Sequence, residues 1–379
     1  MTDFKRLGDI ATYINGYAFK PEDRGNEGLP IIRIQDLTGN SYDLGFYNGE
    51  YPERIEINNG DVLISWSGSL GVYLWNKGKA LLNQHIFKVV FDKAEIDKSY
   101  FIYAIQHYLK EMEAKTHGAT MKHITKKDFD DMLVPYPNMQ KQRETAGILS
   151  MVDGIIVSCQ QELTKLDELV KSRFVEMFGL PGTDVHGWGM SSLGEICEIN
   201  PKKSQDARLT NGLLVSFVPM PSVSESGDID TTQVKPYDEV KTGFTYFAEN
   251  DVLFAKITPC MENSKGAVAT GLYNGIGFGS TEFHVLRPAK ETATPCWIYT
   301  LTVFPQFRID AASNMTGSAG QRRVPASFLE NYRVSVPPLE LQNRFAAFAA
   351  EVDKSKLAVK QSLEKLETLK KSLMQEYFG

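Results

Sequence analysis

The sequence repeats itself once at an offset of 200 residues, and this repeat limits the possible folds more than any local propensity does. Residues 134–179 align without a gap onto residues 334–379, with 16 of 46 positions identical. A match of this length indicates that one structural unit is present twice. The 379 residues also exceed what one hydrophobic core usually organises, so we expect several domains.

Both copies of the repeat have the apolar spacing of a coiled-coil helix, with apolar side chains in alternating steps of three and four residues. The seam consists of Val152, Ile156, Leu163, Leu166 and Val170 in the first copy and of Val352, Val359, Leu363, Leu366 and Leu373 in the second. Lys356 and Lys370 interrupt it. One such stretch alone would favour a dimerisation coil. Two matched stretches favour an antiparallel pair within the chain, because each can cover the other.

The segments around the two helices predict the domain organisation. We expect a first globule at 1–136, a long helix at 137–180, a second globule at 181–336 and a second long helix at 337–379. Runs of β-branched residues predict strands in both globules, and residues 295–312 predict a helix. The expected fold class is α+β: two mixed α/β globules separated by two long helices that form an antiparallel coiled coil, with internal pseudo-twofold symmetry.

Composition and charge narrow the possible functions. The formal net charge of −6 argues against a uniformly basic, nucleic-acid-coating protein but leaves room for a local basic cleft. The four cysteines are widely spaced, and no pair has the two-residue separation of zinc or redox motifs. No run approaches the roughly 18 to 20 apolar residues that span a bilayer. We therefore expect a cytoplasmic protein with reduced thiols and no metal.

The motifs that would indicate catalysis are missing from the sequence. Residues 68–71 and 317–320 are rich in glycine but lack the following Lys-Ser/Thr of a phosphate-binding loop. The six histidines show no metal-ligand spacing. The string at 200–203 fails at the third and fourth positions of the Asn/Asp-Pro-Pro-aromatic loop of base methyltransferases. We expect a protein that is not an enzyme and binds no cofactor; a nuclease with an unrecognised site is an alternative.

The globules instead carry clustered cations beside polar and aromatic residues, which can contact phosphates and base edges. The candidate DNA-binding residues of the first globule are Trp66, Lys115, His117, Lys122, His123, Lys126 and Lys127. Those of the second are Lys256, Thr258, Asn263, Lys265, Gln321, Arg322 and Arg323. Because cations occur at matching places in both halves, the sequence favours duplex DNA binding. The alternatives are solvated surface charge for the cations and a core or rim aromatic for Trp66.

Several strings and the two-copy layout are shared with one known family. The strings are VPPLELQ at 336–342 ahead of a long helix, VSFVPM at 215–220, ITPCMENSK at 257–265 and GFGSTE at 277–282. On these residues the chain resembles the specificity subunit of type I restriction–modification systems. The first repeat copy departs from the pattern at its helix start, where Asn138 and Met139 follow Pro137.

The resemblance implies a non-catalytic subunit with two target recognition domains, each of which reads one half of a split DNA target. The paired helices would set the gap between the half-sites and dock two modification subunits, which use S-adenosylmethionine to methylate adenine. Restriction subunits, which use ATP and Mg to translocate and cleave DNA, would join them. An alternative from the residues is a coiled-coil scaffold whose globules bind protein or sugar.

Overall fold

The structure is a computed structural model that describes residues 3–40, 43–115, 126–318 and 320–379. The chain divides into two compact units, of which the first contains residues 1–160 and 361–379 and the second contains residues 161–360. Each unit therefore combines one globule with a part of both long helices.

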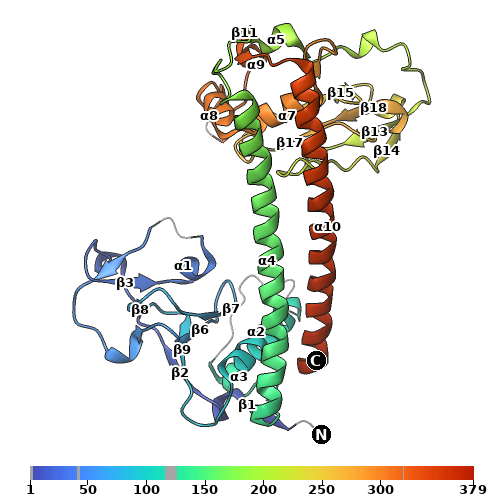
Figure 1. Ribbon diagram of the computed structural model, residues 1–379. Helices are drawn as coiled ribbons and strands as arrows, with labels where there is room; N and C mark the ends of the chain where they lie inside the picture. The colour runs from blue at the N-terminus through green and yellow to red at the C-terminus, as the bar shows by residue number, and fades with distance from the viewer. Residues whose placement is uncertain (1–2, 41–42, 116–125, 319) are drawn as a thin grey trace. The chain divides into compact units, whose positions relative to one another are not determined.

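The globule of the first unit is built on two four-stranded sheets and a two-stranded ribbon (Figure 1). One sheet has the order β2-β9-β6-β7, with bounds Thr12–Asn15, Ile86–Val90, Val62–Ser65 and Gly71–Leu74. The other has the order β4-β3-β8-β5, with bounds Phe46–Tyr47, Leu29–Ile32, Ala80–Leu82 and Glu56–Ile57. The ribbon pairs β1 (Phe4–Arg6) with β10 (Leu133–Pro135). The helices are α1 (Ile34–Thr38), α2 (Lys98–Lys115) and α3 (Lys126–Asp130).

The globule of the second unit repeats this plan strand for strand. Its sheet β12-β19-β16-β17 has the bounds Cys197–Ile199, Phe283–Pro288, Val252–Ala255 and Gly266–Val268. Its sheet β14-β13-β18-β15 has the bounds Val234–Pro236, Leu214–Val218, Ile276–Gly279 and Thr245–Ala248. The ribbon pairs β11 (Met190–Ser192) with β20 (Arg333–Ser335). The helices are α5 (Leu193–Ile196), α6 (Tyr237–Val240), α7 (Pro295–Val303), α8 (Pro305–Ser313) and α9 (Ala326–Asn331).

The matching sheet orders confirm the α+β class and the duplication. Both globules even share one parallel pair in an otherwise antiparallel sheet, β3 with β8 and β13 with β18. One expected helix, at 295–312, is divided into α7 and α8. The break falls at Phe304, which has extended backbone angles, because the following Pro305 disfavours the helical conformation of the residue before it.

The long helices α4 (Met139–Phe178) and α10 (Leu339–Phe378) begin in the same way in the two units. A buried glutamine stands in the first turn of each helix, Gln142 in α4 and Gln342 in α10. Its amide donates to the carbonyl of Pro137 or Pro337 and accepts a backbone N–H of the globule, at 2.8 to 2.9 Å. This repeated glutamine fixes the start of each helix against its globule.

Helices α4 and α10 pack against each other in both units and run antiparallel (Figure 1). In the first unit, Leu149 of α4 lies in one cluster with Phe378 near the end of α10. In the second unit, Phe174 near the end of α4 contacts Phe345 near the start of α10, with 5.5 Å between the ring centres. The paired helices that the sequence predicts are therefore present.

All ten predicted seam residues are buried or half-buried. The two lysines that interrupt the seam are half-buried as well, and each forms an ion pair with the other helix. Lys356 Nζ lies 2.6 Å from Asp167 Oδ1 in the second unit. Lys370 Nζ lies 2.6 Å from Asp153 Oδ1 in the first. The long stems of the lysines cover apolar surface, while their charges reach carboxylates at the edge of the seam.

Candidate nucleic-acid interface

Two loops of the second globule, far apart in the sequence, form one surface. The loop that follows β16 contains residues 256–265, and the loop that follows α8 contains residues 314–325. The backbone N–H of Thr258 donates to the carbonyl of Arg322 at 3.0 Å, and a second backbone bond joins Val324 to Lys256 at 2.9 Å. The structure therefore brings the two cationic patches of this globule together.

Arg323 is held inside this surface by an acidic partner that the sequence pattern did not indicate. Its guanidinium donates to both carboxylate oxygens of Glu282, at 2.8 and 2.9 Å. This pairing lowers the pKa of the Glu282 carboxyl and raises that of Arg323. Because the pair is bidentate, its geometry is fixed and most of the Arg323 charge is balanced locally. Arg323 therefore positions the loop rather than presenting a free cation.

The other predicted residues of the second globule divide into exposed and tethered ones. Gln321 and Arg322 are exposed, and the Arg322 guanidinium lies 4.0 Å from Glu262. Asn263 donates to Glu225 at 3.0 Å, and the half-buried Lys265 donates to the Met220 carbonyl at 3.3 Å. Asn263 and Lys265 thus hold the loop against residues 219–226, and Gln321 and Arg322 face solvent. The Thr258 hydroxyl donates to Glu262 at 3.0 Å.

Lys256 has an environment unlike that of the other cations. It is half-buried, and its ammonium group forms no hydrogen bond or ion pair with any residue that the structure describes. Burial lowers the pKa of its ammonium, Glu282 opposes this shift, and Arg323 adds to it. Glu282, the acid that acts on this pKa, is already bonded to Arg323. Lys256 therefore carries a partly desolvated charge that an external anion could satisfy.

In the first globule the structure places only part of the predicted cluster. Lys126 and Lys127 are exposed on α3, and Lys126 pairs with Asp130 at 3.2 Å. Lys115 is the last residue of α2. His117, Lys122 and His123 lie outside the described residues. Trp66 is half-buried and stacks on Phe87, with ring centres 5.5 Å apart. Trp66 thus forms part of the rim of the core.

The sheet register shows which residues of the two globules correspond. Ser65 pairs with Ile86 at the end of β6, and Ala255 pairs with Phe283 at the end of β16. One residue further along each strand, Trp66 corresponds to Lys256. One residue before β9 and β19, His85 corresponds to Glu282. The same place in the fold therefore holds two aromatic rings in contact in one globule and two oppositely charged residues in the other.

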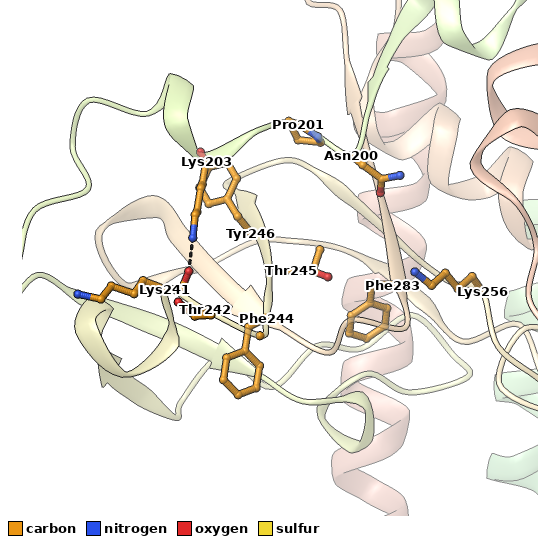
Figure 2. A pocket seen from close by; sticks show the side chains of 11 residues that line it. Asn200, Pro201, Lys203, Lys241, Thr242, Phe244, Thr245, Tyr246, Lys256 and Phe283 are labelled. Carbon is orange, nitrogen blue, oxygen red and sulfur yellow. Dashed lines mark hydrogen bonds between the residues drawn. The ribbon is translucent and has the colours of Figure 1, made fainter.

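Sequence reasoning missed a concave pocket that opens beside Lys256 (Figure 2). Its cavity of about 440 Å³ is lined by residues of three loops, among them Asn200, Lys203, Lys241 and Phe244. These residues lie far apart in the sequence and form no local motif, although the lysines at 202, 203 and 241 were a weak signal.

Elsewhere, among the residues that the structure describes, no group of three His, Cys, Asp or Glu side chains could hold a metal ion. No helix in the described part of the chain is long and apolar enough to cross a membrane.

The duplicated fold and its basic loops agree with a comparison against known protein families. The family model described as the type I restriction modification DNA specificity domain matches residues 2–168 and again residues 186–369. The chain therefore belongs to this family of DNA specificity domains.

Individual relatives include specificity subunits of type I restriction enzymes. The chain is 44% identical over 161 residues to the type I restriction enzyme EcoAI specificity subunit of Escherichia coli, a match that covers 42% of the chain and 26% of that relative. The EcoEI specificity subunit of the same organism has the same identity and coverage. The chain thus spans about a quarter of the length of these two curated relatives. A putative type I restriction enzyme, the MjaX specificity subunit of Methanocaldococcus jannaschii, is 20% identical to the chain. This match covers 98% of the chain and 91% of that relative.

Two solved structures share the fold. One is the S subunit of a type I restriction–modification system from M. genitalium, with a TM-score of 0.54, 15% identity, and coverage of 100% of the chain and 96% of that structure. The other comes from work on complex assembly and conformational transition of the type I R-M system. It has a TM-score of 0.57 and 16% identity, and the match covers 99% of the chain and 97% of that structure. At these identities the likeness concerns the fold.

Proposed function

We propose that this chain is the non-catalytic, sequence-specific DNA-binding subunit of a type I restriction–modification enzyme. Residues 1–136 and 181–336 would be its two target recognition domains, each reading one half of a bipartite duplex target. Residues 137–180 and 337–379 would be the spacer helices. The family membership and the exposed donors of the second globule support this assignment.

One observation carries the proposal. The two globules have the same strand order and register but different side chains at corresponding positions, Trp66 with His85 in one and Lys256 with Glu282 in the other. A scaffold made of two identical modules would have no need for this difference. Two readers of different half-sites do need it, because different bases present different donors and acceptors in the groove.

The helix pair would serve two purposes. It would hold the recognition domains at a fixed separation, so that binding of one half-site raises the effective concentration of the other domain at its own half-site. It would also dock two modification subunits, which would carry S-adenosylmethionine for adenine methylation. Restriction subunits with ATP and Mg would join this assembly.

The outer face of α4 supports the docking part of the proposal. Ile148, Met151 and Ile155 are 41%, 68% and 44% exposed on this helix. Gly147 and Gly154 lie beside them, and a side chain added at either glycine would meet no atom within 4 Å. Each glycine costs the helix about 1 kcal/mol relative to alanine, and in the described chain no other segment fills the space left by the absent side chain. A closely packed helix from another subunit could fill that space.

The experiment that tests the proposed function is a methylome comparison. The DNA of a host that carries this gene with its modification subunits, and that of the same host without the gene, would be sequenced for methylated adenine. We expect methylation at one split, asymmetric sequence that disappears when the gene is deleted. A methylome that does not depend on the gene would contradict the proposal, and so would a random duplex library from which the complex selects no sequence.

A further inference from the structure

The pocket beside Lys256 lies wholly within the second globule and has a strongly one-sided chemistry. Its walls come from the turn after β12, the turn before β15 with the first two residues of that strand, the residue after β16, and Phe283 at the start of β19 (Figure 2). Three of its lining residues are lysines, Lys203, Lys241 and Lys256, and none of the described lining residues is a carboxylate. In a chain with a net charge of −6, such a cavity favours an anionic ligand.

The three lysines differ in how far their charges are available. The Lys241 ammonium lies 3.1 Å from Asp238 Oδ1 and points away from the cavity (Figure 2). The Lys203 ammonium donates to the Lys241 carbonyl, so it spans the turn at the pocket mouth. Lys256 has no such partner among the residues that the structure describes. The pocket thus contains the ammonium group of Lys256, which has no described partner, and that of Lys203, whose described partner is a neutral carbonyl.

Asn200 adds a neutral donor whose orientation is fixed by its neighbours. His284 Nε2 lies 2.8 Å from the Val324 carbonyl, so this nitrogen carries the proton and Nδ1 is an acceptor. The Asn200 amide Nδ2 donates to that Nδ1 at 3.0 Å, and its Oδ1 accepts the Val285 N–H at 3.1 Å. With Oδ1 engaged inside the globule, Asn200 can offer the pocket only an N–H.

We propose that the pocket between Asn200, Lys203 and Lys256 binds a backbone phosphate of the DNA strand that the second recognition domain reads. The inference rests on the proposed function and deepens it. A phosphate oxygen accepts hydrogen bonds and carries charge, which matches a site made of donors and ammonium groups. The pocket continues the exposed surface of Gln321 and Arg322, because Lys256 is backbone-bonded to Val324. Since Trp66 takes the place of Lys256 in the first globule, the phosphate site belongs to the second domain alone.

The matched test compares Lys256→Gln with Lys241→Gln in the full chain assembled with its modification subunits. Both changes remove one lysine charge from the same pocket lining, but Lys241 is already paired with Asp238. For Lys256→Gln we expect roughly tenfold weaker binding of the target duplex. The slope of log affinity against log salt should be shallower by about 0.9, the value for one phosphate contact on duplex DNA. Lys241→Gln should change the slope by less than half as much.

A neutral backbone analogue locates the contact. Single methylphosphonates, which lack the phosphate charge, are placed in turn along the half-site of the second domain. At one position the substitution should weaken the wild-type complex and leave the Lys256→Gln complex unaffected.

Equal losses of affinity in both proteins at every position, or a Lys256→Gln salt slope equal to that of the wild type, would overturn the phosphate site while leaving the proposed function intact. If the Lys256→Gln change alters the effect of a base substitution but not that of any methylphosphonate, Lys256 contacts a base and the proposal is wrong. Failure of the wild-type complex to prefer its target would instead refute the proposed function.

Discussion

His284 shows how a single side chain connects several loops of the second globule. It lies on β19, donates to the loop that carries Arg323 and accepts from Asn200 in the turn after β12. Burial lowers the pKa of its imidazole; its hydrogen bond to the Val324 carbonyl and Glu282 oppose this shift, and Lys256 adds to it. The neutral ring is the form that fits this network, because only neutral histidine offers one donor and one acceptor.

This environment predicts a pH dependence of local stability. The unfolded chain binds a proton at His284 near its ordinary pKa of about 6.5, and the folded chain does so only at lower pH. Stability of the second globule should therefore fall as the pH decreases from 7 to 5. In His284→Gln, whose amide can keep a donor and an acceptor without titrating, this part of the fall should be absent. Hydrogen-exchange protection factors of β19 in the two proteins measure the difference, and parallel pH profiles would count against the assignment.

At the residue scale, the sequence indicated which residues are cationic but not what each cation does. Arg323 and Lys256 are both in the predicted set, yet Arg323 is paired and Lys256 is uncommitted. The difference depends on Glu282, which binds Arg323 but not Lys256. Glu282 directly precedes β19 and lies 41 residues before Arg323 in the sequence. Such long-range pairs have no local signature. The cluster around 116–125 lies outside the described residues, so its contribution stays a prediction.

At the scale of the elements, the long helices were the most predictable part of the fold, because a repeated spacing of apolar residues specifies both the helix and its buried face. The lysines within that spacing were not explained by the pattern. Their partners Asp153 and Asp167 lie on the opposite helix, and only the antiparallel register brings them within reach. The division of the predicted helix 295–312 could have been anticipated from Pro305.

The glycines of α4 give a prediction with opposite effects on stability and assembly. Changing Gly147 and Gly154 together to alanine should stabilise the isolated chain, by about 1 kcal/mol for each helical position. If a modification subunit packs closely here, the added methyl groups should weaken its binding. Thermal unfolding of the chain and titration with the modification subunit measure the two effects.

The matched control for this pair of changes is Ser172→Ala, an exposed position of the same helix about five turns beyond Gly154. It should leave assembly unchanged. Tighter or equal binding by the alanine variant at 147 and 154 would show that the modification subunit docks elsewhere on the chain.

At the scale of the whole molecule, the duplication was visible in the sequence, but the sheet plan of the globules was not. The strands are short and pair across long separations, and the parallel pairs β3·β8 and β13·β18 cannot be read from local alternation. The bases that such a domain reads have no local sequence signature either, because readout depends on loop geometry and on DNA shape as well as on side-chain identity.

If the paired helices hold the two recognition domains at a fixed separation, as proposed, a longer helix pair should change the target spacing without changing the target sequence. Seven residues would be inserted after Ile156 in α4 and seven after Leu366 in α10, positions that face each other in the register set by the Asp153–Lys370 and Asp167–Lys356 pairs. At about 1.5 Å per residue this lengthens the pair by about 10 Å, or roughly three base pairs. Methylome sequencing should show the same half-sites with a longer gap. An unchanged gap would contradict the proposal that the helices set the distance between the half-sites.

The short ribbons β1–β10 and β11–β20 have a consequence for how such a chain can change over time. In each half, the strand that opens the globule is hydrogen-bonded to the strand that closes it, directly before the following long helix begins. The second globule is therefore joined to the two long helices at neighbouring points, through β11 after α4 and through β20 before α10. If each globule reads one half-site, as proposed, an exchange of the coding sequence for residues 181–336 would replace one half of the specificity and leave the other half as it was inherited.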